Sequence, residues 1–422
     1  MGLFNTFKNR SERLAGRYAI SLDIGTEFVK SLIFKIEGDG EHGVVLGVGR
    51  ERQKLGDMQS GAVTDIAGVV ATCEKSLEQA AEMAGVRPEQ AIIGIAGELV
   101  KGTTTTVRYE RLKPKTKIDV PELKNIIQKV QWKAFDRVRH QLAWETGHPE
   151  IDIKLINAAI VDVRIDGYRV TNPIGFQGKD VTIGVFNAYA PLVHLGALQT
   201  IAAELELDLL SIAAEPYAVA RCMGIEDAAE FSAIFIDVGG GTTDIAVVAD
   251  GGVVGTKMFA LGGRAFTKRL AQELNVNYEE AEQIKIKYSQ DKLKPEYMKL
   301  VKETLEGDIK VWLSGVELSL SEFSNIDLLP ARILLCGGGT SLTGLQSVLQ
   351  RGEWYKQLPF SRRPQVSFIK PDDVVNIIDQ TKKLQNPSDV TPMGLANLAL
   401  DLAGDETMMG GILRRAVKMM QT

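Results

Sequence analysis

Three glycine-rich turns in the sequence carry residues that are suited to binding phosphate. The first turn is DIGTEFVK at residues 23–30, and the second is DVGGGTTD at residues 237–244. In each turn an Asp ends an apolar run and is followed by glycine and a hydroxyl residue. Glycine lets backbone N–H groups approach phosphate oxygens closely. Lys30 adds a positive charge for a β- or γ-phosphate. The pattern predicts two turns that clamp one triphosphate.

The two aspartates that open these turns, Asp23 and Asp237, predict a site for Mg²⁺. Because this ion keeps most of its hydration shell, the carboxylates are expected to hold it through water. The third turn, GGGTSLTG at residues 337–344, is expected to contact the α-phosphate and the nucleoside. None of the three turns is a GxxxxGK[ST] loop or a GxGxxG motif. A lone DxGT run is common in plain turns, but three such turns in one chain favour nucleotide binding.

Apolar runs on both sides of the turns predict the elements that position them. The first turn lies between strands that begin at Tyr18 and Val29, and the second lies between strands over 233–238 and 245–249. Helices are expected over 65–84, 119–145 and 191–205, and further strands over 91–96, 154–190, 209–214 and 332–336. A strand–turn–strand unit that recurs about two hundred residues later predicts two similar halves that face each other across a cleft.

Composition excludes several classes of protein. The 422 residues are 45% hydrophobic, which predicts two or three domains, and the net charge of −5 argues against a nucleic-acid-binding protein. The three cysteines show no CxxC spacing, and the four histidines show no spacing typical of a transition-metal site. No apolar run is long enough to span a bilayer, and the first residues lack the apolar segment of a signal peptide. The expected location is the cytoplasm.

The motifs resemble those of the actin, Hsp70 and sugar-kinase superfamily. The turn at residues 23–30 is similar to its phosphate-1 loop, the turn at 237–244 to its phosphate-2 loop, and the run GGGTSLTGL at 337–345 to its adenosine motif. The runs EPYAVA at 215–220 and TPMGLA at 391–396 resemble its two connecting helices. The resemblance implies an α/β protein of the actin-like ATPase fold. It would have two RNase H-like domains around a nucleotide cleft, with ATP and Mg²⁺ between them.

The resemblance also implies roles for particular residues. Glu215 would orient the water that attacks the γ-phosphate; the alternative is that it caps its helix or forms a structural ion pair. Glu282 and Lys285 lie in an AExxK run and would approach the ribose and adenine; the alternative is a surface pair three residues apart. The residues expected to bind the nucleotide are Asp23, Gly25, Thr26, Lys30, Asp237, Gly239, Gly240, Gly241, Thr242, Thr243, Asp244, Gly262, Gly263, Glu282, Lys285, Gly337, Gly338, Gly339, Thr340 and Ser341.

Within the superfamily the chain most resembles the FtsA family of bacterial cell-division proteins. Residues 91–180 replace the small subdomain of actin and end in NPIGFQG, which resembles the SHS2-type insert of FtsA and of its relative PilM, called subdomain 1C. The expected division is a basic tail (1–18), domain I (19–90 and 181–211), the insert (91–180), domain II (212–404, with a smaller subdomain at about 263–330), and a linker with a terminal helix (405–422).

The last residues predict an amphipathic helix after Gly410 and Gly411. Its apolar and cationic faces would bind an anionic membrane, as the membrane-targeting helix of FtsA does; the alternative is a terminal helix packed on the core. The residues expected at the membrane are Ile412, Leu413, Arg414, Arg415, Val417, Lys418 and Met420. Near the other end, Leu3, Phe4 and Phe7 form a second candidate anchor.

The family resemblance implies an ATP-binding, filament-forming protein with slow ATPase activity. Its expected location is the inner face of the cell membrane, where it would polymerise and tether the ring of the tubulin-like protein FtsZ. One alternative is a PilM-like scaffold of a pilus or secretion machine. A more distant one is a small-molecule kinase, although Glu215-Pro216 stands where such an enzyme needs a catalytic Asp.

Overall fold

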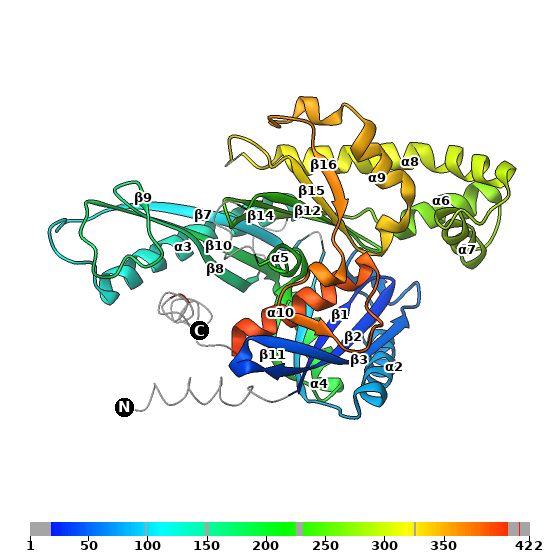
Figure 1. Ribbon diagram of the computed structural model, residues 1–422, viewed down its shortest axis with the longest axis horizontal. Helices are drawn as coiled ribbons and strands as arrows, with labels where there is room; N and C mark the ends of the chain where they lie inside the picture. The colour runs from blue at the N-terminus through cyan, green and yellow to red at the C-terminus, as the bar shows by residue number, and fades with distance from the viewer. Residues whose placement is uncertain are drawn as a thin grey trace.

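The computed structural model describes residues 18–97, 99–147, 152–224, 231–324, 326–403 and 413. Figure 1 shows two domains, one above the other, and a third lobe that projects to the left. The lower domain holds the blue N-terminal strands, and the upper domain holds the yellow and orange segments. The cyan and green lobe is the insert that the sequence predicted.

Domain I is built on a six-stranded sheet with the order β11-β6-β1-β2-β3-β17. Strands β1 (Tyr18–Ile24), β2 (Phe28–Glu37) and β3 (His42–Arg52) are antiparallel, while β6 (Gln90–Ile95) and β11 (Asp208–Ala214) run parallel to β1. Three antiparallel strands followed by two parallel ones are the order of an RNase H-like sheet. A short late strand, β17 (Ile377–Asp379), extends it beyond β3.

Domain II repeats this arrangement. Strands β12 (Ala233–Val238), β13 (Thr243–Ala249) and β14 (Gly252–Phe259) are antiparallel, and β15 (Arg332–Cys336) and β16 (Gln365–Phe368) continue the sheet in parallel. Strands β1 and β12 are therefore equivalent, and each is fully or almost fully buried. The prediction of two similar halves is confirmed.

Helices cover both sheets. In domain I these are α2 (Ile66–Ala84) and α4 (Leu192–Glu204), and in domain II they are α6 (Gly263–Leu274), α7 (Tyr278–Ser289), α8 (Pro295–Ser321) and α9 (Thr343–Arg351). The two connecting helices, α5 (Glu215–Arg221) and α10 (Val390–Ala403), pack against each other between the domains. Smaller elements are strands β4 (Met58–Gln59) and β5 (Ala62–Val63), and short 3₁₀ turns.

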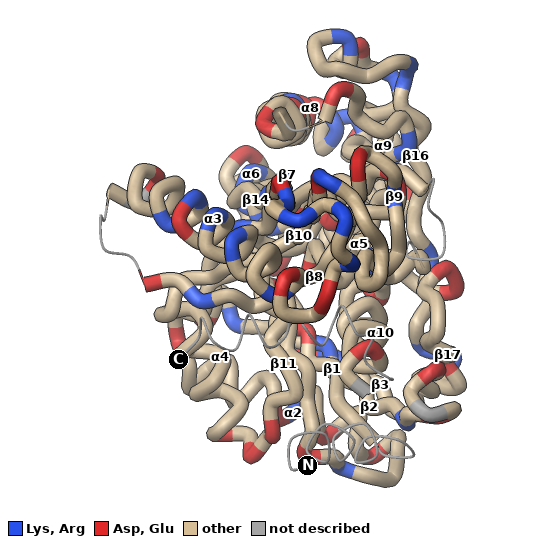
Figure 2. Tube along the Cα trace, turned by 90° about the vertical axis from the view of Figure 1, so that its left-hand side faces the viewer, with Lys and Arg blue, Asp and Glu red and all other residues tan. Residues whose placement is uncertain are grey.

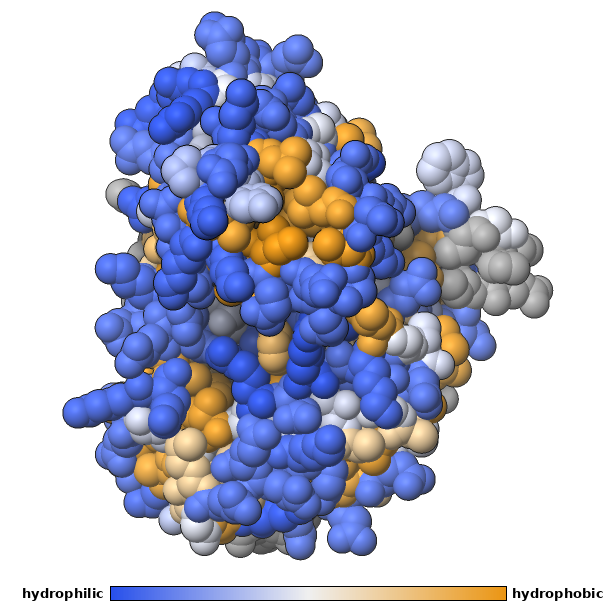
Figure 3. Space-filling model, turned by 90° about the vertical axis from the view of Figure 1, so that its right-hand side faces the viewer, coloured by the Kyte–Doolittle hydropathy of each residue, from blue (hydrophilic) through white to orange (hydrophobic). Residues whose placement is uncertain are grey.

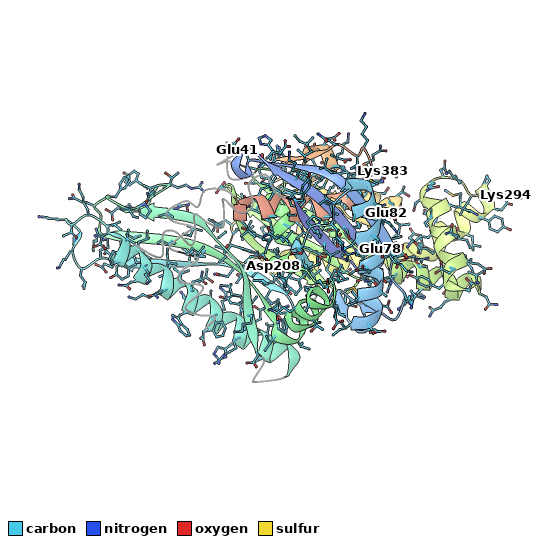
Figure 4. All side chains as sticks on the ribbon, turned by 90° about the horizontal axis from the view of Figure 1, so that it is seen from below. Glu41, Glu78, Glu82, Asp208, Lys294 and Lys383 are labelled. Atoms are coloured by element: carbon cyan, nitrogen blue, oxygen red, sulfur yellow. The ribbon has the colours of Figure 1, made fainter. Side chains whose placement is uncertain are left out.

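The insert consists of β7 (Lys101–Glu110), α3 (Val120–Thr146), β8 (Ile153–Ile165), β9 (Tyr168–Arg169) and β10 (Asp180–Pro191). Helix α3 begins where the sequence predicted, because the carboxylate of Asp119 accepts a hydrogen bond from the N–H of Glu122. From below, the insert extends away from the core on the side opposite Lys294 (Figure 4).

The boundaries of the insert differ from those expected. Residues 91–95 lie in β6, which pairs with β1 inside the domain I sheet, so the insert begins only with β7. Strand β10 pairs with β7 and β8 and belongs to the insert, although residues from 181 on were expected in domain I. Strand β7 also pairs with β14, so the insert joins the domain II sheet as one nine-stranded sheet. The alternation of apolar and polar residues predicts strands, but it does not show which strands pair with each other.

Within the described part of the chain, no helix combines the length and the apolarity that crossing a bilayer requires. The three cysteines are all buried thiols.

Candidate functional site

The cleft between the domains is lined by all three glycine-rich turns. It leaves about 1210 Å³ of empty space, open solvent included. Figure 3 looks at the side of the molecule that carries α2, α6 and α7, where the surface dips between an upper and a lower half. Turns that are two and three hundred residues apart in sequence thus face one cavity, as the sequence predicted.

Asp23 and Asp237 occupy equivalent places at the ends of β1 and β12. Each has an equivalent partner on the next strand: Lys30 lies across from Asp23, and Asp244 lies across from Asp237. The Nζ of Lys30 is 2.9 Å from Oδ2 of Asp23, which makes a part-buried ion pair. In domain II the same position sets two carboxylates side by side. The pseudo-symmetry of the fold therefore produces an attractive pair in one domain and a repulsive pair in the other.

These charges act on one another because all of them are buried. Burial, followed by repulsion from Asp237, raises the pKa of Asp244 well above its usual range. Burial also raises the pKa of Asp237, although the hydroxyl of Thr391 donates to its Oδ2 at 2.5 Å and Lys30 attracts it. Burial lowers the pKa of Lys30, but the charge and hydrogen bond of Asp23 outweigh it, so the net pKa is raised. Around Lys30 the cleft therefore holds more carboxyl groups than this lysine can neutralise, since the other cations that line it, Arg50, Arg264 and Lys285, are paired with other acids.

Glu215 begins α5 and faces the same charges. Its side chain is buried, and burial together with repulsion from Asp23, Asp244 and Asp237 raises its pKa well above the usual range. A carboxyl group in this setting suits a role as proton acceptor or as an acceptor for bound water near a phosphate. Glu215 is the first residue of a buried helix and lines the cavity, so its position favours a role in the cleft over the alternative of a helix cap.

Close contact between the two phosphate turns explains their glycines. A Cβ atom on Gly240 would lie 2.7 Å from the Cβ of Glu27, so a larger residue would push the two domains apart. Gly337 in the third turn has φ of +87°, and a Cβ there would lie 2.0 Å from Oδ1 of Asp237. The glycines therefore let three loops meet around one point while their N–H groups stay close to the cavity.

A polar cluster on α6 and α7 borders the other end of the cavity. Lys285 donates to the carbonyl of Gly263 at 3.0 Å and to the hydroxyl of Thr267 at 2.7 Å, and it is paired with Glu282 at 2.8 Å. Thr267 in turn donates to Glu282 at 2.5 Å. The pair is only about 13% exposed at both side chains, so it is not the surface pair that was the alternative. Burial raises the pKa of the neighbouring Tyr278 to about 12.

Ion pairs bridge the two domains beside the phosphate turns. Glu27 of domain I accepts from the Nε of Arg264 in domain II at 2.7 Å and from the Nε of Arg52 at 2.7 Å. Arg52 also donates to Glu279 of α7 at 2.6 Å, which makes a second crossing between the domains. We call these four residues the cross-domain clasp. A separate pair joins Arg50 to Asp389.

Most of the residues predicted to bind nucleotide line this cavity. They are Asp23, Gly25, Thr26, Lys30, Asp237, Gly239, Gly240, Thr242, Asp244, Gly263, Glu282, Lys285, Gly337, Gly338, Gly339 and Ser341, together with Glu215. Four others are not among its lining residues: Gly241, Thr243, Gly262 and Thr340.

The hydroxyls of Thr243 and Thr340 form hydrogen bonds within the protein and do not line the cavity. Thr243 donates to the carbonyl of Leu261 at 2.7 Å and accepts from the indole N–H of Trp312 at 2.9 Å. Thr340 donates to the carbonyl of Gly337 at 2.6 Å, which closes the third turn on itself. A run of hydroxyl residues in a motif does not reveal which of them face outward, because strand alternation turns neighbours to opposite sides.

Among the lining residues that sequence reasoning missed are four polar ones: Glu27, Arg264, Tyr278 and Thr391. All but Tyr278 lie in or directly beside a quoted motif: Glu27 is in the first turn, Arg264 follows Gly263, and Thr391 begins the TPMGLA run. Their place in the motifs was a cue, but Glu27 and Arg264 are partners from different domains. Sequence spacing alone could not have paired them.

The predicted membrane residues lie outside the described residues, except one. Residues 1–17, which include Leu3, Phe4 and Phe7, also lie outside them, as do Ile412, Arg414, Arg415, Val417, Lys418 and Met420. Leu413 is described and is only 4% exposed; it belongs to an apolar cluster with Ile118, Leu123 and other insert residues. In this structure Leu413 therefore faces protein, contrary to the expectation that it faces lipid.

The fold and the cleft define the class of this protein, an actin-like ATPase fold. The solved structure of the PilM–PilN type IV pilus biogenesis complex matches it with a TM-score of 0.64 at 16% identity, covering 92% of this chain and 100% of that one.

Comparison of sequences narrows the class. The model of the family "Cell division protein FtsA" matches residues 234–394. FtsA of Pseudomonas aeruginosa is 26% identical over 354 residues, or 78% of this chain and 79% of that protein. FtsA of Neisseria meningitidis is 25% identical over 410 residues, or 92% of each. The resemblance to FtsA that the motifs predicted is confirmed, and it extends over most of the chain.

Proposed function

We propose that this protein binds Mg-ATP in the cleft between its two domains. The observation that carries the proposal is the excess of buried negative charge around Lys30: Asp23, Asp237, Asp244 and Glu215 all line one cavity. Among the described residues, Oδ1 of Asp244 is buried without a hydrogen-bond partner. A divalent cation would neutralise this charge and allow a triphosphate to enter.

The lining residues divide between the parts of the nucleotide. Lys30 and the backbone of the first two turns would hold the β- and γ-phosphates, and Asp23 with Asp237 would hold Mg²⁺ through its waters. The third turn and the Glu282–Lys285 pair would hold the nucleoside. When bound, Mg²⁺ supplies charge neutralisation at the phosphates. Glu215 would accept a hydrogen bond from the attacking water and orient it, which supports slow ATP hydrolysis.

In the cell, we infer a role in bacterial division. The proteins similar to this chain over most of its length are cell-division proteins named FtsA. On this basis the protein is an ATP-dependent, actin-like cytoskeletal protein that polymerises on the inner face of the cell membrane. Its partners would be further copies of itself, the tubulin-like division protein FtsZ and anionic lipid. The amphipathic segment at 411–422 would provide the membrane tether.

A second candidate function rests on the fold. The similarity to the PilM–PilN complex supports a scaffold of type IV pilus assembly, which would bind nucleotide without needing to hydrolyse it. A small-molecule kinase is a weaker candidate, because Glu215 and Pro216 begin α5 where an acceptor hydroxyl would need an Asp.

Calorimetry with Mg-ATP tests the nucleotide site. Asp237→Ala is expected to weaken binding about tenfold or more, because the loss of one carboxylate that organises Mg²⁺ costs more than about 1.4 kcal/mol. Asp250→Ala, at an exposed turn after β13, is the matched control and should bind normally. Unchanged affinity in both Asp23→Ala and Asp237→Ala would rule out the proposed phosphate clamp.

A further inference from the structure

Helix α3 of the insert exposes two tryptophans on its outer side. Trp132 is 62% exposed and Trp144 is 86% exposed, whereas the other two tryptophans, Trp312 and Trp354, are 0% and 6% exposed. The two exposed rings are twelve residues apart, which is about 18 Å along the helix axis and about 120° around it, so they flank the outer side of the helix and do not lie in one row. Tryptophan is costly to leave in water and is typical of surfaces that meet a partner or a membrane interface.

The inner side of α3 is fixed in the core, so its outer side keeps a constant direction. Leu123, Ile126 and Val130 are fully buried beneath the helix. The ring of Trp132 contacts the edge of Phe135 at 6.3 Å between centroids, and Phe135 contacts Tyr189 of β10 at 6.1 Å. The helix therefore presents a rigid convex ridge, with Trp132 held in place at its middle.

Exposed cations lie along α3 beside the two tryptophans, together with one exposed acid among them, Asp136, which is paired with His140. Lys129, Lys133, Arg137 and Arg139 are all exposed along α3, and Lys133, Arg137 and Arg139 have no acidic partner among the described residues. The lobe at residues 101–191 holds fifteen Lys and Arg against ten Asp and Glu, while the whole chain holds 49 against 54. Figure 2 looks at this end of the molecule and shows blue segments along α3 and the strands beside it. The lobe is thus a cationic part of an acidic protein.

We propose that the outer side of α3, centred on Trp132 and Trp144, is a second membrane-binding surface that fits an anionic lipid bilayer. Indole rings favour the headgroup level of a bilayer, and Lys and Arg beside them can reach the phosphates. A convex ridge also matches a flat, deformable surface better than it matches a folded partner, which needs a groove or a facing hollow. The proposal does not depend on the nucleotide site, and it differs from the tether proposed at residues 411–422.

Such a contact would fix the orientation of the protein on the membrane. A tether at one point allows the body to rotate, whereas a second contact restricts it. Leu413 belongs to the apolar cluster beneath α3, so the start of the proposed tether lies against the same lobe. Nearby charges would make the contact through α3 sensitive to salt.

Quenching of tryptophan fluorescence by brominated lipid tests the proposal on the full-length protein. Vesicles of phosphatidylglycerol and phosphatidylcholine are prepared with plain or brominated acyl chains. Because Trp312 and Trp354 are buried, quenching would report on Trp132 and Trp144. Emission should fall on brominated vesicles, and Trp132→Phe with Trp144→Phe should abolish the fall. Protein that sediments with both vesicles yet emits equally on them would refute the proposal and leave the terminal tether intact; protein that does not sediment would refute both.

A charge reversal gives an independent readout without touching the packed rings. Lys133→Glu with Arg139→Glu should weaken vesicle binding about tenfold or more, since each cation near an anionic surface contributes about fivefold. Lys302→Glu with Lys310→Glu, both exposed on α8 in the other lobe, changes the net charge equally and is the matched control. Equal losses in both double variants would show that overall charge alone drives binding, and the surface on α3 would have to be abandoned.

Discussion

Asp244 shows how one substitution between equivalent positions changes the chemistry of a site. It occupies in domain II the place that Lys30 occupies in domain I, opposite the strand-ending Asp. The fold repeats, but the sign of the charge does not. The result is a group of four buried carboxyl groups around Lys30, because Arg264 and Lys285, which also line the cleft, are paired with Glu27 and Glu282. A protein without a cationic ligand in this cleft must keep some of these groups protonated, which couples stability to pH.

We expect Asp244→Asn to stabilise the nucleotide-free protein above neutral pH. Burial and Asp237 raise the folded-state pKa of Asp244, so the folded state keeps its proton to higher pH than the unfolded state does. Stability therefore falls as pH rises from the ordinary pKa of Asp through the raised value. Near Asp244, burial likewise raises the pKa of Asp237 and Glu215, while Lys30 opposes the rise in both.

Thermal unfolding as a function of pH measures this effect. The Asn variant should melt a few degrees higher than the parent protein at about pH 8, since 1 kcal/mol moves the midpoint by about 2–4 °C in domains of ordinary size. The difference should vanish below about pH 3, where the carboxyl is protonated in both states. Asp250→Asn, on the surface beyond the same hairpin, should show neither change. A pH-independent difference would mean that packing, and not charge, distinguishes the variant.

Glu215 should matter to hydrolysis more than to binding. If it orients the attacking water, its contribution is realised mainly in the transition state. Glu215→Gln should keep Mg-ATP affinity within a few-fold, and it should lower turnover about a hundredfold, the usual scale for a group that acts on a proton in the transition state. Single-turnover hydrolysis and calorimetry on the same preparation separate the two effects. Normal turnover would leave Glu215 a purely structural residue.

At the scale of elements, the sequence predicted those features that depend on residues close together in the chain. The start of α3 after Asp119 and the paired strands around the first two glycine turns follow from capping and alternation. The clasp could not be predicted, because Glu27 and Arg264 are 237 residues apart and belong to different domains. The same holds for the boundaries of the insert, which depend on the pairing of β6 with β1 and of β10 with β7.

We expect the cross-domain clasp to set the rate of nucleotide release. Arg264 donates to Glu27 and to the carbonyls of Leu55 and Met58, so its planar fork holds domain I against α6. Arg264→Ala should speed the release of a fluorescent ATP analogue about tenfold or more, because a part-buried, hydrogen-bonded ion pair that joins two moving bodies is lost. Arg264→Lys should release the analogue at a rate between those of the parent protein and Arg264→Ala, since lysine keeps the positive charge but lacks the planar guanidinium group.

Arg269→Ala is the matched control for this experiment. Arg269 lies on the same helix and also forms an ion pair, with Asp308 at 3.0 Å, but that pair stays within domain II. Its loss should leave the release rate unchanged. If Arg264→Ala and Arg269→Ala release the analogue equally fast, the effect comes from α6 itself and the clasp has no gating role.

At the scale of the whole molecule, the lobes differ in charge and in what they expose. The insert is cationic and carries two exposed tryptophans, while the remainder is acidic and closes around the nucleotide cleft. Repeating contacts between unlike surfaces of neighbouring copies do not close on themselves and produce filaments. A filament would place many inserts and many terminal segments along one line. Weak single contacts with lipid would then act together.

Assembly on lipid should therefore depend on ATP and on the last residues together. We expect the full-length protein to sediment with anionic vesicles more strongly with Mg-ATP than without it. Deletion of 411–422 should weaken this binding at least about tenfold, because burying a few apolar side chains contributes about 1.5–3 kcal/mol each before ordering costs. The truncated protein should still bind Mg-ATP normally by calorimetry, which controls for folding. Deletion of 2–10 should have a smaller effect. Assembly that is indifferent to nucleotide, or a protein that stays monomeric on and off lipid, would favour the pilus-type scaffold over a division filament.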